Sequence, residues 1–212
     1  MRMEIDSMFE KLLEYGVPSK IAKIAYKIYR EGNQKFNLGE SIYFTGESGA
    51  GKTISSVLAL IYHIEQWKLH PKSWNDPRAA IFIKENDIVE SIKNSYSRPN
   101  IIIRDYDETI EENPYREQKD FVFTASEILI KRYKEVELLI VDDFGIDKTT
   151  DWSYVMLYSI LVARYEWERQ IIFTSNYSLN ELAEKLQDIR LTNRISDWCT
   201  IVQMKNRDFR KK

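Results

Sequence analysis

The residues GESGAGKT at positions 46–53 combine glycines, a lysine and a threonine in an order that suits phosphate chemistry. The pattern G-x-x-x-x-G-K-[ST] is complete in this stretch. Glycines let backbone N–H groups turn towards a phosphate, the lysine supplies a cation, and the threonine hydroxyl can ligate Mg²⁺. The sequence therefore predicts a nucleoside-triphosphate site that also uses Mg²⁺. The expected contact residues are Gly46, Glu47, Ser48, Gly49, Ala50, Gly51, Lys52, Thr53 and Ile54.

Two adjacent carboxylates follow a later apolar run, Leu138–Val141. A strand beside the phosphate loop would bring Asp142 to the Mg²⁺, with Thr53 as the second protein ligand. Asp143, one residue on, can orient and deprotonate a water, which predicts hydrolysis of the nucleotide. The letters D-x-x-G and D-F-G also occur here, but the companion patterns N-K-x-D of GTPases and H-R-D of protein kinases are absent from the sequence. We therefore expect an ATPase that converts ATP and water to ADP and phosphate.

A polar strand end and several arginines can complete such a site. The apolar residues 171–173 are followed by Thr174, Ser175 and Asn176. Asn176 can position a water beside the γ-phosphate, or it can cap the helix expected after it. Arginines also gather near the chain end, and one of them can stabilise the charge that develops as phosphate leaves. They are Arg190, Arg194, Arg207 and Arg210. Arg194 is the best placed, in a short helix beside an apolar residue, and it can act on the ATP of a neighbouring subunit.

The elements that must position these residues alternate between strand and helix. Apolar runs predict strands at 41–45, 79–83, 138–141, 171–173 and 200–203, each apolar on both faces. Helical patterns separate them, which predicts an α/β fold with a parallel sheet between two layers of helices. Two further helical patterns, at 4–15 and 18–31, predict a short extension at 1–39 before a core at 40–212.

Residues 100–120 are hard to interpret, because an apolar triplet is followed by a long charged stretch. They suit either a solvated insertion or polar helix, or an insertion that contacts DNA or a partner. Composition adds little here, because 31 basic and 33 acidic residues give a net charge of −2. Any nucleic-acid surface must therefore be local. The single Cys199 excludes an internal disulfide, and the N-terminus lacks an apolar signal region. No apolar run reaches the roughly 20 residues of a membrane span, so we expect a cytoplasmic protein without membrane contact.

Longer stretches resemble a known family. LLIVDDFG at 138–145, IIFTSNYSLNELAEKL at 171–186 and RLTNRI at 190–195 follow one another, with TTDWSYVMLYSILVARY and NRDFR at their expected places. This succession, over about residues 40–210, is similar to DnaC/DnaI-type helicase loaders and the transposition helper IstB, within the AAA+ ATPases. The resemblance implies a P-loop NTPase with a three-layer α/β/α sandwich and a five-stranded parallel sheet. The chain departs from the family in one respect, since the sequence ends soon after the last strand and we therefore expect no C-terminal helical lid.

The same resemblance implies roles for single residues. Lys52 and Thr53 match Walker A, Asp142 and Asp143 match Walker B, and Asn176 matches sensor 1. Arg194 matches the arginine finger that acts on the neighbouring subunit, and Arg210 matches the sensor 2 arginine. Single-stranded DNA is expected to contact about residues 86–134. The basic candidates there are Lys93, Arg98, Arg104, Lys131, Arg132 and Lys134, with Tyr96 and Tyr106 available to stack on bases.

The function expected from these features is that of a helicase-loader-like ATPase in DNA replication. It would assemble on single-stranded DNA as a homo-oligomer through Arg194 acting in trans, with turnover stimulated by DNA or a partner. A replicative helicase or another replication protein is the expected partner. The protein would act in a prokaryotic cell, and a phage, virus or plasmid would suit as its source. Two alternatives stay open, an IstB-like transposition helper and a non-enzymatic, ATP-dependent protein-assembly module.

Overall fold

The computed structural model of the chain describes residues 39–69, 80–104, 120–145 and 150–204, together with helical positions at Glu10, Leu13 and Lys23. The two helices predicted at 4–15 and 18–31 otherwise lie outside the described residues. The same holds for the segment after residue 204, where a lid was not expected. The domain boundary at residue 40 therefore stays a prediction.

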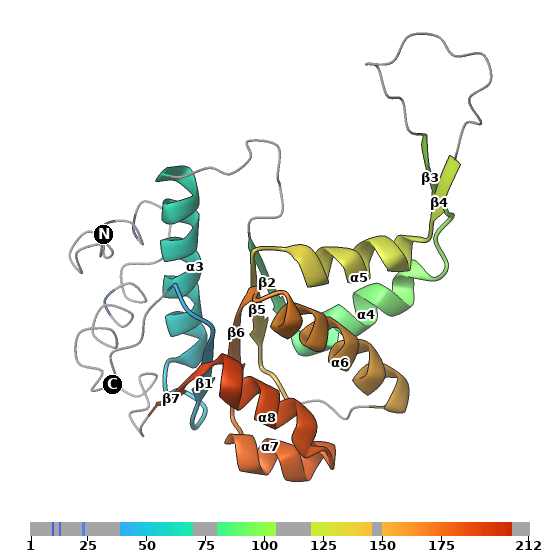
Figure 1. Cartoon of the computed structure of the whole chain (residues 1–212). Coiled ribbons are helices and arrows are strands. Elements are labelled where there is room, and N and C mark those ends of the chain that lie inside the picture. The colour runs from blue at the N-terminus through green and yellow to red at the C-terminus, as the bar shows by residue number, and fades with distance from the viewer. Residues whose placement is uncertain are drawn as a thin grey trace.

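A five-stranded parallel sheet forms the centre of the molecule, in the order β2-β5-β6-β1-β7 (Figure 1). Its strands are β1 (Ile42–Thr45), β2 (Ala80–Lys84), β5 (Leu138–Asp142), β6 (Gln170–Ser175) and β7 (Thr200–Gln203). The predicted sheet is confirmed, with strand ends that differ by one to two residues. Because the strands are parallel, their carboxyl ends meet at one edge of the sheet, where ligands of open α/β sheets bind.

Helices cover both faces of this sheet. They are α3 (Lys52–Leu69), α4 (Glu85–Ser95), α5 (Ala125–Glu135), α6 (Asp151–Glu166), α7 (Leu179–Leu186) and α8 (Ile189–Trp198). Side chains alternate along each strand, so Ile42 and Phe44 pack with α3 while Tyr43 packs on the other face with helices of the α4–α8 group. Figure 1 shows α3 on one side of the sheet and the other helices on the opposite side. The predicted three-layer sandwich is confirmed.

Capping residues set where most of these helices begin. Thr124 caps α5 and Ser178 caps α7, each in a capping box with the glutamate three residues on. The exception is α4, which begins directly after Lys84 of β2 without a side-chain cap, although Asn86 and Asp87 are residue types that often cap helices. Strand pairing with β5 fixes Lys84 in extended backbone, and this pairing overrides the local capping preference.

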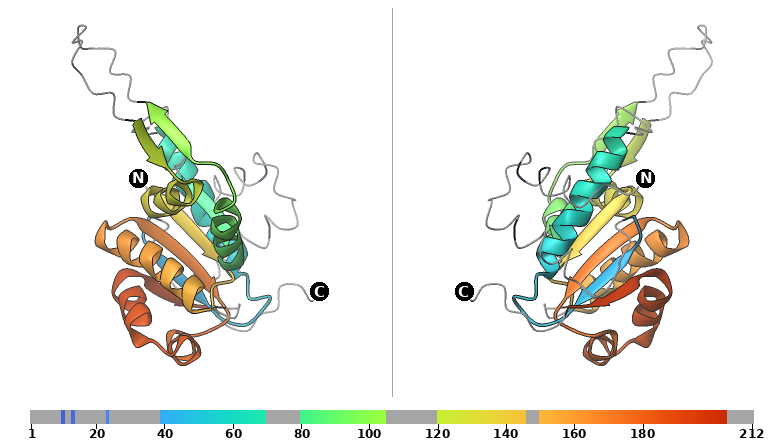
Figure 2. Two further views of the ribbon diagram at one scale, coloured as in Figure 1. Left: turned by 90° about the vertical axis from the view of Figure 1, so that its right-hand side faces the viewer. Right: turned by 90° about the vertical axis from the view of Figure 1, so that its left-hand side faces the viewer.

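Two strands outside the main sheet were not predicted. β3 (Ile101–Arg104) and β4 (Asp120–Phe123) pair antiparallel between α4 and α5. Figures 1 and 2 show this hairpin projecting away from the sandwich. The interpretation of 100–120 as a polar helix is therefore wrong at both ends of the segment, while residues 105–119 lie outside the described residues. Within the ranges that the structure describes, no helix is long and apolar enough to cross a membrane.

Candidate nucleotide-binding site

The loop between β1 and α3 is shaped by glycine. Gly46, Gly49 and Gly51 all have positive φ, at 144°, 88° and 94°, which residues with a Cβ rarely adopt. Gly46 has a second constraint, since a Cβ there would lie 2.4 Å from the carbonyl oxygen of Met204, just after β7. The N–H of Met204 in turn donates to the carbonyl of Thr45 at 2.7 Å. The start of the loop is therefore fitted closely against the end of a neighbouring strand.

Lys52 begins α3 and is buried below the loop. Its Nζ donates to the carbonyl oxygens of Gly46 at 2.7 Å and Glu47 at 2.9 Å. It also donates to Oδ1 of Asn176 at 2.8 Å. The structure thus brings the lysine and the asparagine together, while their roles at a phosphate stay a prediction. Glu47 and Ser48 are exposed at the rim of the loop.

Oxygen atoms suited to Mg²⁺ lie next to this lysine. The Thr53 hydroxyl donates to Oδ1 of Asp142 at 2.9 Å, and the Thr174 hydroxyl donates to the same oxygen at 2.6 Å. Asp142 is buried at the end of β5. A hydroxyl beside a carboxylate matches the oxygen ligands that Mg²⁺ prefers, so these residues fit an ion bound together with nucleotide phosphates. Thr53 and Asp142 are the residues that would hold it.

Asp143 occupies an unusual position directly after the strand. Its φ is 59°, a left-handed conformation that is costly for a residue with a Cβ. The Thr174 hydroxyl accepts its backbone N–H at 3.0 Å, and Lys84 lies 3.4 Å from its carboxylate. That side chain is 42% exposed, so a water can reach it. Thr174 and Lys84 were missed from the sequence, because nothing in the residue types near 84 or 174 indicates that either contacts residue 143.

Three other elements form hydrogen bonds to the turn after Asp143. The Gly145 N–H donates to the buried carboxylate of Glu85 at 2.6 Å, and Lys185 of α7 donates to the Gly145 carbonyl. The Ser175 hydroxyl of β6 donates to the Phe144 carbonyl at 2.7 Å. Because both peptide groups are held, the acidic pair has a fixed position at the strand ends.

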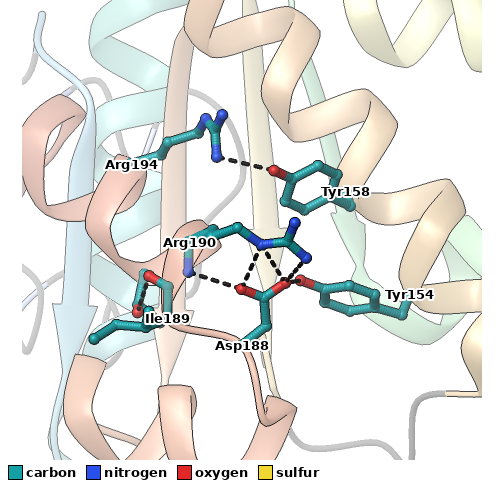
Figure 3. A network of polar contacts seen from close by, with 7 residues as sticks. Tyr154, Tyr158, Asp188, Ile189, Arg190 and Arg194 are labelled. Carbon is teal, nitrogen blue, oxygen red and sulfur yellow. Dashed lines mark hydrogen bonds and ion pairs between the residues drawn. The ribbon is translucent and has the colours of Figure 1, made fainter.

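The predicted arginine finger lies on α8 and faces α6 (Figure 3). Arg194 donates from Nη1 to the hydroxyl of Tyr158 at 2.9 Å and is partly exposed. One turn earlier, Arg190 is bound by Asp188 and is 70% exposed. These residues form a second polar region, which we call the arginine face and define as Tyr154, Tyr158, Asp188, Arg190 and Arg194. Arg210 lies outside the described residues.

Comparisons with known proteins agree on the fold and add a match to one family over part of the chain. A model of the family described as IstB-like ATP binding protein matches residues 116–212. The DnaC helicase loader has a similar structure, with 20% identity, a TM-score of 0.54, and coverage of 87% of this chain and 90% of that chain. DnaI is 17% identical with a TM-score of 0.53, and the match covers 97% of this chain and 96% of that chain.

Residues 116–212 of this chain are thus similar to the IstB-like ATP binding proteins, and the chain shares the α/β fold of the DnaC helicase loader. The replication initiator DnaA bound to AMPPCP and single-stranded DNA shares the fold, with 19% identity and a TM-score of 0.54. That match covers 87% of this chain but 46% of DnaA, so the chain spans about half the length of the initiator. No curated protein matches the sequence. The description of the matching family supports ATP binding, and the similar structures support the fold.

The structure divides the DNA-binding candidates into two groups. Lys93 and Arg98 lie near the hairpin at the end of α4, where the ammonium of Lys93 is 5.5 Å from the ring of Trp152. Tyr96 packs edge-on against the same ring, at 6.1 Å between centroids. The other group, Lys131, Arg132 and Lys134, occupies the far end of α5. Arg104 is placed only by its backbone in β3, and Tyr106 lies outside the described residues.

Proposed function

We propose that the protein hydrolyses ATP and uses the cycle to assemble on single-stranded DNA as a helicase-loader-like factor in replication, in the cytoplasm of a prokaryotic cell. The arrangement at the strand ends carries this proposal. Lys52 and Asn176 lie together above Thr53 and Asp142, and the accessible carboxylate of Asp143 lies on the next residue. A binding protein needs only the first four, whereas a positioned carboxylate that water can reach serves hydrolysis.

In the proposed cycle each residue has one task. Lys52 binds the outer phosphates, Thr53 and Asp142 hold Mg²⁺, and Asn176 orients the attacking water. Asp143 takes the proton of that water. Mg²⁺ would neutralise charge on the phosphates, as it does in phosphoryl-transfer enzymes generally. Residues 1–39 form an extension before the core at 40–212, and Arg210 meets the nucleotide of its own subunit.

The second half of the site comes from a neighbouring copy in this proposal. Arg194 contacts a neutral phenol oxygen rather than a carboxylate, so its positive charge is not neutralised by this contact. A guanidinium in that state suits the phosphate of an incoming neighbour. ATP would then lie between two subunits, and hydrolysis would depend on assembly.

The DNA part of the proposal draws on the relatives and on the surface of α4. A solved structure of DnaA carries single-stranded DNA, and DnaC is described as a helicase loader. Tyr96 is 57% exposed beside Trp152 and Lys93, and exposed aromatic rings next to cations suit unpaired bases and their phosphates. A hexameric replicative helicase is the proposed protein partner.

Phosphate release with and without DNA tests the proposal. We expect turnover that rises when single-stranded DNA is added and that disappears in Asp143→Asn, while this variant still binds ATP·Mg²⁺. Arg194→Ala alone should be inactive, but mixing it with Asp143→Asn should restore turnover, because the second variant donates an intact arginine. Turnover that persists in Asp143→Asn would contradict the hydrolytic role. No recovery in the mixture would contradict the role of Arg194 in trans.

An IstB-like transposition helper is the second candidate, because the matching family model is the IstB-like one. The two functions differ in the DNA they need. A helper of this kind is expected to form filaments on duplex DNA and to respond to duplex in the same assay. A loader should respond to single strands and should retain a hexameric helicase in a pull-down with ATP·Mg²⁺. Binding of ATP without turnover under any condition would instead favour the non-enzymatic assembly module.

A further inference from the structure

Two tyrosines of α6 face the arginines of α8 (Figure 3). Tyr154 and Tyr158 are one helical turn apart, with ring centroids 5.8 Å from each other. Arg190 and Arg194 are spaced in the same way on α8, so each helix presents two side chains to the other. The four side chains could pair in more than one way, and the structure shows which pairing is made.

Arg190 pairs with Asp188 rather than with a tyrosine. Its carboxylate accepts from the Arg190 Nε at 3.0 Å and from Nη2 at 2.6 Å. It also accepts from the Tyr154 hydroxyl at 2.6 Å. The Arg190 guanidinium, followed by the Tyr154 hydroxyl, holds the pKa of the Asp188 carboxyl well below its usual range. Asp188 is therefore charged at neutral pH, and it retains Arg190 through a charge-assisted contact.

This arrangement leaves the Tyr158 oxygen to Arg194. Both guanidinium carbons lie at similar distances from the Tyr158 ring centroid, 5.8 Å for Arg190 and 5.6 Å for Arg194. Only Arg194 donates to its hydroxyl among the contacts in the described part of the chain, at 2.9 Å. A neutral hydroxyl fixes the direction of a guanidinium without cancelling its charge. A carboxylate in the same place would compete with a phosphate for it.

We propose that Tyr158 is the positioning residue for Arg194, which it holds ready for the nucleotide of a neighbouring subunit, and that Asp188 keeps Arg190 away from the Tyr158 hydroxyl. This inference rests on the proposed role of Arg194 in trans. A long arginine side chain loses rotamer freedom when it meets a phosphate, and holding it beforehand reduces that loss. Tyr158 acts through Arg194, so its removal should lower turnover and leave ATP binding unchanged.

Tyr158→Phe is the first test, because it removes one oxygen and keeps the ring. We expect kcat to fall about fivefold, as for one lost hydrogen bond, with KM and the nucleotide dissociation constant unchanged. Tyr133→Phe is the matched control, since it loses a hydroxyl that contacts Ser91 between α4 and α5. It should turn over ATP like the wild type. Wild-type turnover in Tyr158→Phe would overturn the inference and leave the proposed function standing.

Subunit mixing separates positioning from damage. Asp143→Asn subunits keep an intact Tyr158 and Arg194, so mixing them with Tyr158→Phe subunits should restore turnover. The turnover per active subunit should then equal that of a mixture of Arg194→Ala and Asp143→Asn subunits prepared in the same way. If the Arg194→Ala mixture recovers and the Tyr158→Phe mixture does not, Tyr158 has a structural role and the inference fails. If neither mixture recovers, the proposed role of Arg194 in trans fails as well.

The part assigned to Asp188 has its own test. In Asp188→Asn the carboxylate charge is lost and Arg190 is released to compete for Tyr158, so turnover should fall about threefold. Adding Arg190→Ala removes the competitor, and the double variant should regain most of that loss. Arg190→Ala alone should stay within about twofold of the wild type, as expected for an exposed side chain. A double variant that is no better than Asp188→Asn would overturn the proposed role of Asp188.

Discussion

The residues at the strand ends, which we call the strand-end cluster, and the arginine face are both polar, but they are built differently. The cluster consists of Lys52, Thr53, Asp142, Asp143, Thr174 and Asn176. Lys52 and Asp142 of the cluster are buried, and their contacts are made by loop carbonyls and by residues on neighbouring strands. On the arginine face, Arg190 is 70% exposed and the contacts join two helices. The cluster therefore holds buried groups that can bind phosphates and their metal ion without rearrangement. On the face, the guanidinium groups are partly or largely exposed to solvent. A side chain must be exposed in this way if it is to contact another molecule.

The strand-end cluster is also held more rigidly than the arginine face. Thr174 and Asp142 lie on hydrogen-bonded parallel strands, so the hydroxyl that contacts both acids is fixed by the sheet. Arg194 is fixed by one hydrogen bond at the end of a long side chain. The difference implies that changes in the cluster should abolish function in the subunit that carries them. Changes in the face, whether they abolish turnover as in Arg194→Ala or weaken it as in Tyr158→Phe, should be complemented by a neighbour.

Lys52→Ala should have the largest effect. It removes the cation for the phosphates and three hydrogen bonds beneath the loop, so turnover should fall by about a hundredfold or more. Steady-state phosphate release and titration with a fluorescent nucleotide measure this. Lys131→Ala, on an exposed lysine that pairs only weakly with Glu135, is the control and should match the wild type when turnover is measured without DNA. Activity retained in Lys52→Ala would mean that the nucleotide is bound elsewhere.

Gly46→Ala should destabilise the loop rather than remove a catalytic group. The new Cβ would meet the Met204 carbonyl at 2.4 Å with φ at 144°, and we expect a loss of about 1–3 kcal/mol in the free energy of unfolding. Denaturant titration gives that value. Gly49→Ala also has a positive φ, at 88°, but lies three residues from the contact with Met204, so we expect it to cost less. Equal losses would show that backbone conformation alone, rather than β7, constrains the loop.

Thr174→Val tests whether one hydroxyl organises the acidic pair. The substitution keeps the side-chain shape and removes the contacts to Asp142 and to the Asp143 N–H. We expect turnover to fall about tenfold with a small change in nucleotide affinity. Thr192→Val, which loses only a bond to the Ile189 carbonyl within α8, is the control. Similar effects of the two variants would argue against a special role for Thr174.

The smallest expected effect concerns pH and the arginine face. A carboxyl whose pKa is depressed by folding stabilises the protein above its unfolded value, about 4. That contribution is lost as the pH falls through the lower folded value. The melting temperature of Asp188→Asn should therefore be about 1–3 °C below that of the wild type at pH 7, and the gap should close towards pH 2. Asp197→Asn, also on α8, serves as the control. A gap that widens in acid would contradict the sign of the shift.

Much of the cluster was predictable because its signals are local in the sequence. The phosphate loop is eight consecutive residues, and both acids and Asn176 follow apolar runs that become strands. A parallel sheet then brings these strand ends together without further information. The fold was predictable for the same reason, since five apolar runs alternate with helical patterns.

The contacts that were missed join residues far apart in the chain, through side chains of common types. Lys84 of β2 contacts Asp143, which follows β5, and Tyr158 of α6 contacts Arg194 of α8. Threonine, lysine and tyrosine occur at many positions, so no residue type marks these in advance. The hairpin was missed because β3 and β4 are four residues each and are separated by a long charged stretch rather than by a turn signature.

β7 connects the two regions within each subunit. α8 ends at Trp198, the four residues of β7 begin at Thr200, and Met204 then borders Gly46 at the start of the loop. Within one subunit, β7 thus links the helix that carries Arg194 to the phosphate loop. In the proposed assembly each arginine would meet the nucleotide of the next subunit, so we expect events at one nucleotide to affect the next. Turnover should then fall more steeply than in proportion as inactive Asp143→Asn copies are added, and a strictly proportional fall would show that the subunits work independently.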